Sequence, residues 1–310
     1  MTGSPGSPLA TARAPFGRVL TAMITPFTPD GELDLVTAQK VAAYLVDNGN
    51  DGLVVSGTTG ESPTTNPDED GQLLSAVLEA VGDRATVVAG VGNNDTRASA
   101  RLARQAAAEG AHGLLLVSPY YNKPPQAGLV KHFLTVADAG GSTPVMLYDI
   151  PGRAGVRIAF DSYLAVARDE RIVAVKDAVG DLPGGCRVMA ETGLALYSGD
   201  DGLNLPWLAC GAAGVVSVVA HVAGRAYADL VAAVDTGDLA TARRVNAELA
   251  PVVAAIMSAT SQGAIMSKAA LQLLGVVEHR TVRSPYVEAD DDQVAELRTV
   301  LESAGYLARP

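Results

Sequence analysis

The chain has 310 residues, of which 34 are acidic and 23 basic, so its net charge is −11 and its pI lies near 4.8. This charge repels phosphate backbones and anionic lipid surfaces, and we expect no nucleic-acid partner. Hydrophobic residues make up 48% of the chain, and its 32 glycines and 17 prolines stay below the share typical of low-complexity chains, which excludes a disordered or fibrous protein. Apolar stretches end well before the ~20 residues of a membrane span, so we expect no membrane partner.

The first fifteen residues are small, polar and interrupted by proline. They predict a disordered N-terminal tail over residues 1–17, without the long apolar core of a secretory signal. The two cysteines, Cys186 and Cys210, form no Cys-x-x-Cys motif and are too few for a disulfide framework. This usage is typical of a reduced, cytoplasmic setting, and we expect both cysteines to be buried packing residues.

Eight short runs rich in Val, Leu and Ile recur along the chain, and polar or glycine-rich residues follow each of them. The runs cover residues 19–25, 53–56, 86–91, 114–118, 145–149, 172–177, 194–198 and 215–219. Between them, the helical spacing of apolar residues predicts helices over 35–47, 68–81, 96–109, 127–137, 161–168, 183–191 and 203–210. Because the runs are nearly continuous rather than alternating, they indicate strands buried on both faces of a parallel sheet.

This alternation predicts an α/β fold, a (β/α)8 TIM barrel over residues 18–235. Only helices are expected after the eighth strand, over 220–233, 239–257, 264–274 and 291–304, so residues 236–310 are predicted to form a C-terminal helical region. An open, doubly wound sheet is the main alternative. Such a sheet normally has fewer strands and a phosphate-binding glycine motif, and neither G-x-G-x-x-G nor G-x-x-x-x-G-K-[ST] occurs here.

The functional groups of such a barrel lie at the carboxyl ends of its strands. After the second strand, residues 56–62 combine glycines with the hydroxyls of Thr58 and Thr59, and successive amides with these hydroxyls can hold a carboxylate. A simple turn is an equally good interpretation. Tyr121 follows the fourth strand and Tyr148 lies near the end of the fifth, where a phenol can pass a proton in a dry site or can simply pack at the rim.

Lys176 closes the apolar sixth strand and gives the sharpest signal in the sequence. Strand parity places it on the same face as Ile172 and Ala174, and the small Ala174 leaves space in the lumen beneath its stem. In the lumen, desolvation would lower the pKa of the amine and favour the neutral form that attacks a ketone as a Schiff-base nucleophile. The alternative is a lysine that extends outward to solvent.

Other polar groups receive structural interpretations. The histidines show no metal-ligand spacing, so we expect no metal and assign packing and surface roles to His112, His132, His221 and His279. Asp200 and Asp201 follow the seventh strand, where we favour capping over acid-base work. The acidic run 288–292 precedes a helical pattern and is expected to complement the dipole of that helix.

Six motifs together carry a resemblance to a known family. They are GTTGES at 57–62, SPYYNKP at 118–124, YDIPGR at 148–153, VKDA at 175–178, SGDD at 198–201 and GVVSV at 214–218. In this order they resemble the 4-hydroxy-tetrahydrodipicolinate synthase family, also called dihydrodipicolinate synthase, within the N-acetylneuraminate lyase superfamily of pyruvate-dependent class I aldolases. The resemblance extends from about residue 20 to at least the eighth strand.

The resemblance implies a lyase of lysine and diaminopimelate biosynthesis that condenses pyruvate with L-aspartate 4-semialdehyde and needs no cofactor. It implies that Lys176 forms an imine with pyruvate, that Thr58 and Thr59 hold the pyruvate carboxylate, and that Thr59, Tyr148 and Tyr121 form a proton relay. It further implies that Tyr121 reaches in from a neighbouring subunit of a homo-oligomer, a dimer of dimers. The other residues that it implies for the site are Arg153, which would bind the semialdehyde carboxylate, and Gly199 and Val216, which would line the site.

Some positions depart from the best-known pattern of the family. Asp149 stands where Asn is usual, which suggests a difference of lineage. At the lysine-inhibition site of the family, Asn94 matches, but Pro67, Asp70 and Ala98 replace histidines and a glutamate, so we expect weak or absent inhibition by lysine. Two alternative functions stay open: another pyruvate-dependent aldolase or lyase, acting on a sugar acid or on N-acetylneuraminate, and a non-catalytic barrel that binds a keto acid.

Overall fold

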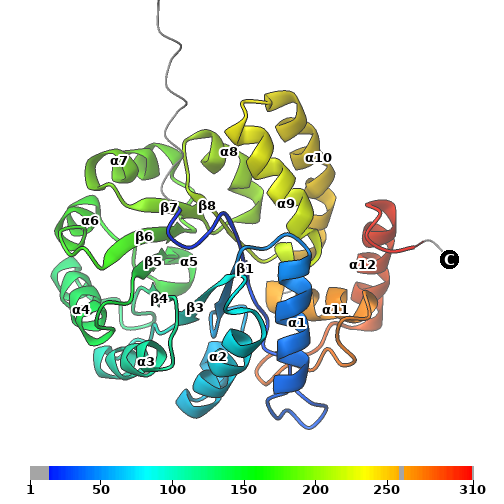
Figure 1. The fold of residues 1–310 in the computed structure, drawn as a ribbon, viewed down its shortest axis with the longest axis horizontal. Helices are drawn as coiled ribbons and strands as arrows, with labels where there is room; N and C mark the ends of the chain where they lie inside the picture. The colour runs from blue at the N-terminus through cyan, green and yellow to red at the C-terminus, as the bar shows by residue number, and fades with distance from the viewer. Residues whose placement is uncertain (1–13, 258–261, 309–310) are drawn as a thin grey trace, which may run out of the picture.

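The computed structural model describes residues 14–257 and 262–308. Eight parallel strands form a closed barrel in which each strand pairs with the next along the chain and β1 pairs with β8 (Figure 1). The strands are β1 (Val19–Ala22), β2 (Gly52–Val55), β3 (Thr86–Gly90), β4 (Gly113–Val117), β5 (Val145–Asp149), β6 (Ile172–Asp177), β7 (Ala195–Ser198) and β8 (Gly214–Ser217). The predicted TIM barrel is confirmed, and the open sheet is excluded.

Helices surround the barrel and continue beyond it. They are α1 (Leu35–Asp47), α2 (Pro67–Val81), α3 (Thr96–Ala108), α4 (Gln126–Ala139), α5 (Pro151–Ala154), α6 (Phe160–Val166), α7 (Leu182–Thr192), α8 (Asn204–Ala209), α9 (Ala220–Asp235), α10 (Leu239–Ile256), α11 (Gly263–Leu273) and α12 (Asp291–Ser303), with 3-10 turns η1 (Ser62–Thr64) and η2 (Asp201–Leu203). The predicted helices are confirmed to within a few residues. The short elements η1, η2 and α5 were not predicted, because three or four residues show no helical period.

Two apolar layers hold the barrel together, because successive strand residues point to opposite faces. Residues between strands and helices form the larger core, whereas the lumen is filled by Phe16, Leu20, Ala22, Val54, Val88, Leu115, Met146, Tyr148, Ala174, Tyr197, Ala213 and Val216. On β6, Ala174 lies in the lumen as predicted, but Ile172 packs outward, so its expected orientation is wrong. The pairing of β5 with β6 shifts register between Val145 and Met146, and this irregularity reverses the parity at the start of β6.

The first described residues close the lower end of the lumen. Phe16 is fully buried there, its backbone amide donates to the Tyr197 hydroxyl at 3.1 Å, and that hydroxyl donates to the Gly17 carbonyl at 3.0 Å. The tail expected over residues 1–17 is therefore wrong for residues 14–17, because burying a phenyl ring in the lumen orders this segment. Residues 1–13 lie outside the described part of the chain.

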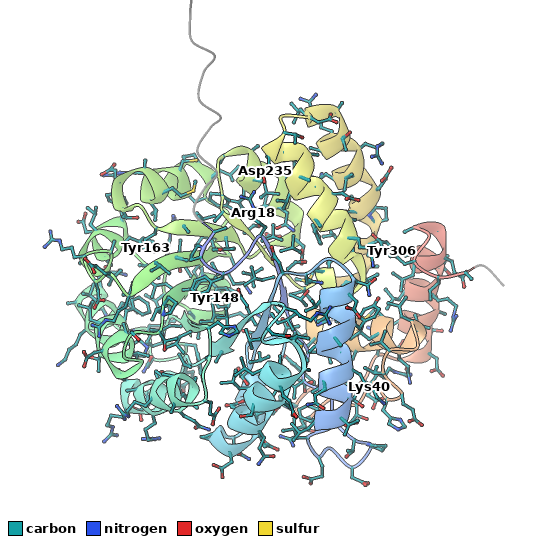
Figure 2. The ribbon with its side chains drawn as sticks, viewed as in Figure 1. Arg18, Lys40, Tyr148, Tyr163, Asp235 and Tyr306 are labelled. Atoms are coloured by element: carbon teal, nitrogen blue, oxygen red, sulfur yellow. The ribbon has the colours of Figure 1, made fainter. Side chains whose placement is uncertain are left out.

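The C-terminal helices α10, α11 and α12 lie together on one side of the barrel, beyond α9 and α1 (Figure 1). The end of α9 is tied to the start of the barrel by an ion pair of 2.6 Å between Arg18 and Asp235 (Figure 2). The expected boundary between 235 and 236 falls in the turn from α9 to α10. Within the described residues, no helix has the length and apolar character needed to cross a membrane.

Of the two aspartates assigned to capping, Asp200 caps a 3-10 turn, whereas Asp201 caps no helix and holds the loop after β8, so that assignment is wrong for Asp201. The acidic run 288–292 places Asp291 and Asp292 in the first turn of α12, as expected for residues that complement its dipole. Asp290 accepts a hydrogen bond from the Gln293 amide at the start of α12, and Asp200 accepts one from the Gly202 amide at η2. The expectation for the cysteines is wrong, because Cys186 on α7 is half-buried and Cys210 is exposed. Both lie in the outer ring of helices, and Cys210 ends α8 where the chain meets solvent.

Candidate active site

Lys176 lies in the lumen near the carboxyl end of β6, as predicted. It is only 5% exposed, it stands in register with Tyr148 of β5, and its Nζ lies 4.4 Å from the centre of the Tyr148 ring. Burial lowers the pKa of Lys176 to about 8; the Asp201 carboxylate opposes this shift and the Arg153 guanidinium adds to it. A much larger fraction of this amine is therefore neutral near pH 7 than for an ordinary lysine, and the neutral form is the one that can attack a carbonyl.

Gly199, directly after β7, leaves the space that the lysine stem occupies. A Cβ at this position would lie 2.9 Å from both Cγ and Cε of Lys176 and 2.8 Å from the carbonyl oxygen of Asp177. Any side chain here would push the amine aside. Glycine at this strand end is thus a steric requirement for the position of Lys176.

Tyr148 supplies a phenol beside the amine. Burial raises its pKa to about 12, against the opposing charge of Arg153. The phenol therefore stays protonated at neutral pH and acts as a hydrogen-bond donor. A donor packed against a nucleophile in a dry site can hand a proton to a developing alkoxide and recover it later.

The Thr58–Thr59 loop follows β2 and is wound tightly by two residues in the left-handed region, Ser56 at φ 52° and Glu61 at φ 58°. The Glu61 amide donates to the Thr58 carbonyl at 3.1 Å and closes the turn. Thr59 is 9% exposed. Non-glycine residues rarely adopt such dihedral angles, and they persist where surrounding contacts hold them, commonly at functional sites.

A cavity of about 90 Å³ brings most of the predicted residues together. Its lining includes Lys176, Tyr148, Thr58, Thr59, Arg153 and Gly199. A neighbouring cavity of about 310 Å³ shares Thr58, Tyr148 and Arg153 with it and is also lined by Tyr121. A nucleophilic amine, a phenol, hydroxyls and a guanidinium thus surround space for small carboxylic acids, next to a larger entrance.

Two predicted residues are placed differently from the other six. Tyr121 is 88% exposed, has φ 73°, and lines only the outer cavity. Val216 is buried within the lumen layer and does not line the inner cavity, whereas Val218, two residues later, does.

Residues 15–304 match the dihydrodipicolinate synthetase family. The chain is 58% identical to the 4-hydroxy-tetrahydrodipicolinate synthase of Kineococcus radiotolerans, covering 98% of this chain and 99% of that protein, and 54% identical to that of Mycolicibacterium paratuberculosis, covering 96% and 97%. The chain belongs to the dihydrodipicolinate synthetase family. Among solved structures it resembles the lysine-bound enzyme of Cyanidioschyzon merolae, with a TM-score of 0.91 and 38% identity, covering 95% of this chain and 100% of that one. It also resembles dihydrodipicolinate synthase of Bacillus anthracis, with a TM-score of 0.89 and 39% identity, covering 95% of this chain and 99% of that one.

In this member of the dihydrodipicolinate synthetase family, the C-terminal helical region also contributes to the site. Gln262, directly before α11, accepts a hydrogen bond of 2.7 Å from Arg153 Nη2 and lines the inner cavity. Tyr286, from the loop between α11 and α12, lines both cavities. These two residues were not predicted, because each lies more than a hundred residues from its partners and no local motif marks it.

Asp201 does not line the inner cavity, but its charge acts on Lys176. Its carboxylate accepts hydrogen bonds from the Ser217 hydroxyl, from the Val218 amide at 2.9 Å and from the Val219 amide at 3.1 Å. These contacts fix the loop between β8 and α9, and the negative charge counteracts the fall in the pKa of Lys176. Among the described residues, no group of three His, Cys, Asp or Glu side chains is placed to hold a metal.

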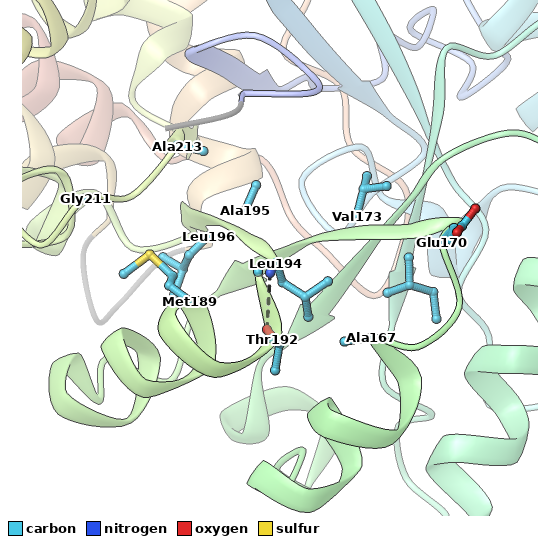
Figure 3. A pocket seen from close by; sticks show the side chains of 12 residues that line it. Ala167, Glu170, Val173, Met189, Thr192, Leu194, Ala195, Leu196, Gly211 and Ala213 are labelled. Atoms are coloured by element: carbon cyan, nitrogen blue, oxygen red, sulfur yellow. Dashed lines mark hydrogen bonds between the residues drawn. The ribbon is translucent and has the colours of Figure 1, made fainter. Parts of the chain in front are cut away.

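A larger cavity, of about 600 Å³, lies at the opposite end of the barrel, at the amino ends of β6, β7 and β8 (Figure 3). The described residues that line it are mostly small or apolar, and Glu170 is the one titratable side chain among them. The Leu194 amide donates to the Thr192 hydroxyl at 3.2 Å within this lining. Size alone does not mark the active site, because the chemically equipped cavity is the smaller one around Lys176.

Proposed function

We propose that the chain is a 4-hydroxy-tetrahydrodipicolinate synthase, a lyase of lysine and diaminopimelate biosynthesis, which condenses pyruvate with L-aspartate 4-semialdehyde. The observation that carries this proposal is the buried Lys176 amine, with its lowered pKa, beside Tyr148 and facing the Thr58–Thr59 loop. Family membership supports the same activity. Thr58 and Thr59 would hold the pyruvate carboxylate, and the guanidinium of Arg153 would bind the carboxylate of the second substrate.

The first half of the reaction makes pyruvate nucleophilic. The neutral Lys176 amine attacks the ketone carbon, Tyr148 supplies a proton to the departing oxygen, and water leaves as the imine forms. The protonated imine nitrogen then withdraws electrons from the adjacent methyl group, which loses a proton and becomes an enamine. Because this nitrogen is the electron sink, the steps require no cofactor.

The second half joins the two substrates. The enamine carbon attacks the aldehyde, whose oxygen takes a proton and becomes the hydroxyl of the product. The amine of the semialdehyde then attacks the imine carbon, closes the ring and displaces the Lys176 amine. One water is lost overall, and Thr59, Tyr148 and Tyr121 would carry the protons between these steps.

Treatment with pyruvate and borohydride is expected to reduce the imine and to add a mass to Lys176, located by peptide mapping. Because the pKa of Lys176 is about 8, the adduct should form about fivefold faster at pH 8 than at pH 7 and should level off above pH 9. Absence of an adduct at Lys176 would refute the mechanism. A tenfold gain per pH unit through pH 10 would show an ordinary, exposed amine instead.

We also propose a homo-oligomer as the working form, which the exposure of Tyr121 supports, and a dimer of dimers as the arrangement that the family resemblance implies. This phenol is 88% exposed at the outer cavity, so it is free to enter the cavity of a second copy.

We further propose that residues 18–235 form the barrel and residues 236–310 its helical region. Val216 is proposed to line the pyruvate site. The enzyme is proposed to work in the cytoplasm. Free thiols at Cys186 and Cys210 support the last of these.

Lysine is expected to inhibit this enzyme weakly or not at all. Asp70, at one of the positions that differ from the family pattern, accepts a hydrogen bond of 2.8 Å from Thr65, and burial raises its pKa. Synthase activity with and without excess lysine tests this expectation. The Cyanidioschyzon merolae enzyme is the comparison in the same assay, and strong inhibition of both proteins would contradict the prediction.

A further inference from the structure

A buried ion pair joins the active-site loop to the C-terminal region. Lys268, on α11, is 1% exposed, and its Nζ pairs with Oε1 of Glu61, which is fully buried. The same ammonium donates to the Thr281 carbonyl at 2.7 Å and lies 4.3 Å from the centre of the Phe27 ring. The charge is thus held by a carboxylate, a carbonyl and an aromatic ring within the protein. Glu61 and Lys268 are 207 residues apart in the chain.

The second oxygen of Glu61 is also held. Its Oε2 accepts a hydrogen bond of 2.9 Å from the Arg283 amide. The Arg283 guanidinium donates to the Thr64 carbonyl at 2.9 Å and pairs with Glu69 of α2 at 2.6 Å. Lys268 of α11 and Arg283 of the loop that follows it therefore hold the two carboxylate oxygens of Glu61, and Glu69 of α2 in turn holds Arg283.

Glu61 is part of the turn that presents the two threonines. Its amide closes that turn on the Thr58 carbonyl, and its left-handed backbone sets the direction of the chain. A displacement of Glu61 would carry Thr58 and Thr59 with it. The other end of α11 reaches the same cavity, since Gly263 and Ala264 line it beside Lys176.

Such a pair is poorly explained as a source of stability. Burying two charges costs about as much free energy as their attraction returns, and an apolar pair of similar shape is often equally stable. A buried, directional contact does, however, hold a loop in one position. The location of this pair, directly behind a strained turn that lines the cavity, favours a role in positioning.

We propose that Glu61 and Lys268 are a positioning pair that fixes Thr58 and Thr59 for binding of the substrate carboxylate. This inference rests on the proposed function, because it assigns the carboxylate of pyruvate to that loop. Through this pair the C-terminal helical region sets the affinity for the keto acid. Neither residue lines the cavity, so both act through the loop.

The test measures how the rate of Lys176 adduct formation, trapped with borohydride, depends on pyruvate concentration. Lys268→Met and Glu61→Gln should each raise the half-saturating pyruvate concentration about 10-fold to 100-fold, since misplacement by about 1 Å has effects of this size. The limiting rate at saturating pyruvate should change much less. Lys40→Met, at an exposed position on α1, is the matched control and should leave both values unchanged.

The double variant Glu61→Gln/Lys268→Met separates positioning from folding, because it leaves no unpaired buried charge. Its thermal midpoint should recover toward that of the original protein, whereas its half-saturating pyruvate concentration should stay high. Unchanged pyruvate dependence in the single variants, or recovery of both properties in the double variant, would overturn the inference. If the original protein itself forms no adduct, the proposed function fails instead.

Discussion

Lys176→Met is expected to abolish the pyruvate adduct and to lower synthase turnover by about 10⁴-fold or more, the scale of loss seen when a covalent nucleophile is removed. Of the described residues that line the inner cavity, Lys176 is the one amine. Tyr148, Thr58 and Thr59 would still bind the keto acid. They offer no nitrogen for an imine, so binding without chemistry should remain.

The same substitution is expected to stabilise the fold. A buried lysine whose pKa falls from 10.5 to about 8 is held in its less favourable charged form at neutral pH. The penalty is fully present below pH 8 and disappears as the pH rises through 10.5, where the unfolded chain also loses the proton. Methionine removes the penalty, so the free energy of unfolding at pH 7 should rise by about 3 kcal/mol.

Urea unfolding at pH 7 and at pH 10.5 measures this effect. The advantage of the methionine variant should be largest at pH 7 and should shrink at pH 10.5. Lys40 lies exposed on α1 (Figure 2). Lys40→Met changes a lysine in the same way and should show neither effect. A variant that loses stability at pH 7 would show that the ammonium is well accommodated, and the lowered pKa would then be wrong.

The barrel was predictable because its signals are local. Strands buried on both faces leave long Val and Leu runs, and glycine-rich turns separate them, so the fold and the strand ends that carry Lys176, Tyr148 and Thr58 follow from pattern alone. Parity failed at Ile172, because one irregular register position reverses the face without any mark in the sequence. The same period that places Lys176 inward therefore misplaces a residue four positions before it.

Long-range contacts set the limit of sequence reasoning. Gln262 and Tyr286 reach the cavity from the helical region, Lys268 reaches Glu61 in the loop beside it, and nothing near them in the chain identifies their partners. Phe16 was assigned to a tail because its neighbours are small and polar, yet one aromatic ring inserted into the lumen orders residues 14–17. Features that depend on where the chain returns in space required the structure.

Arg153→Ala is expected to impair condensation strongly while sparing the first half-reaction. Loss of a hydrogen-bonded charge that recognises a carboxylate costs about 2–5 kcal/mol, so kcat/KM for the semialdehyde should fall about 30-fold to 5000-fold. Trapping of pyruvate on Lys176 should continue. It should be somewhat slower at pH 7, because the Arg153 charge helps to lower the pKa of Lys176.

Arg153→Lys is the matched control, since it keeps the charge but loses the planar fork that binds a carboxylate through two hydrogen bonds. Its loss should be smaller, about 10-fold, and trapping should stay near the original rate.

Gln262 accepts a hydrogen bond from Arg153 and should contribute to the same step. Gln262→Ala should therefore weaken semialdehyde use and leave the pyruvate adduct intact. Equal losses for pyruvate and semialdehyde in Arg153→Ala would place the guanidinium on the first substrate. Release of pyruvate from a longer sugar acid, unaffected by this substitution, would instead identify an aldolase that acts on sugar acids.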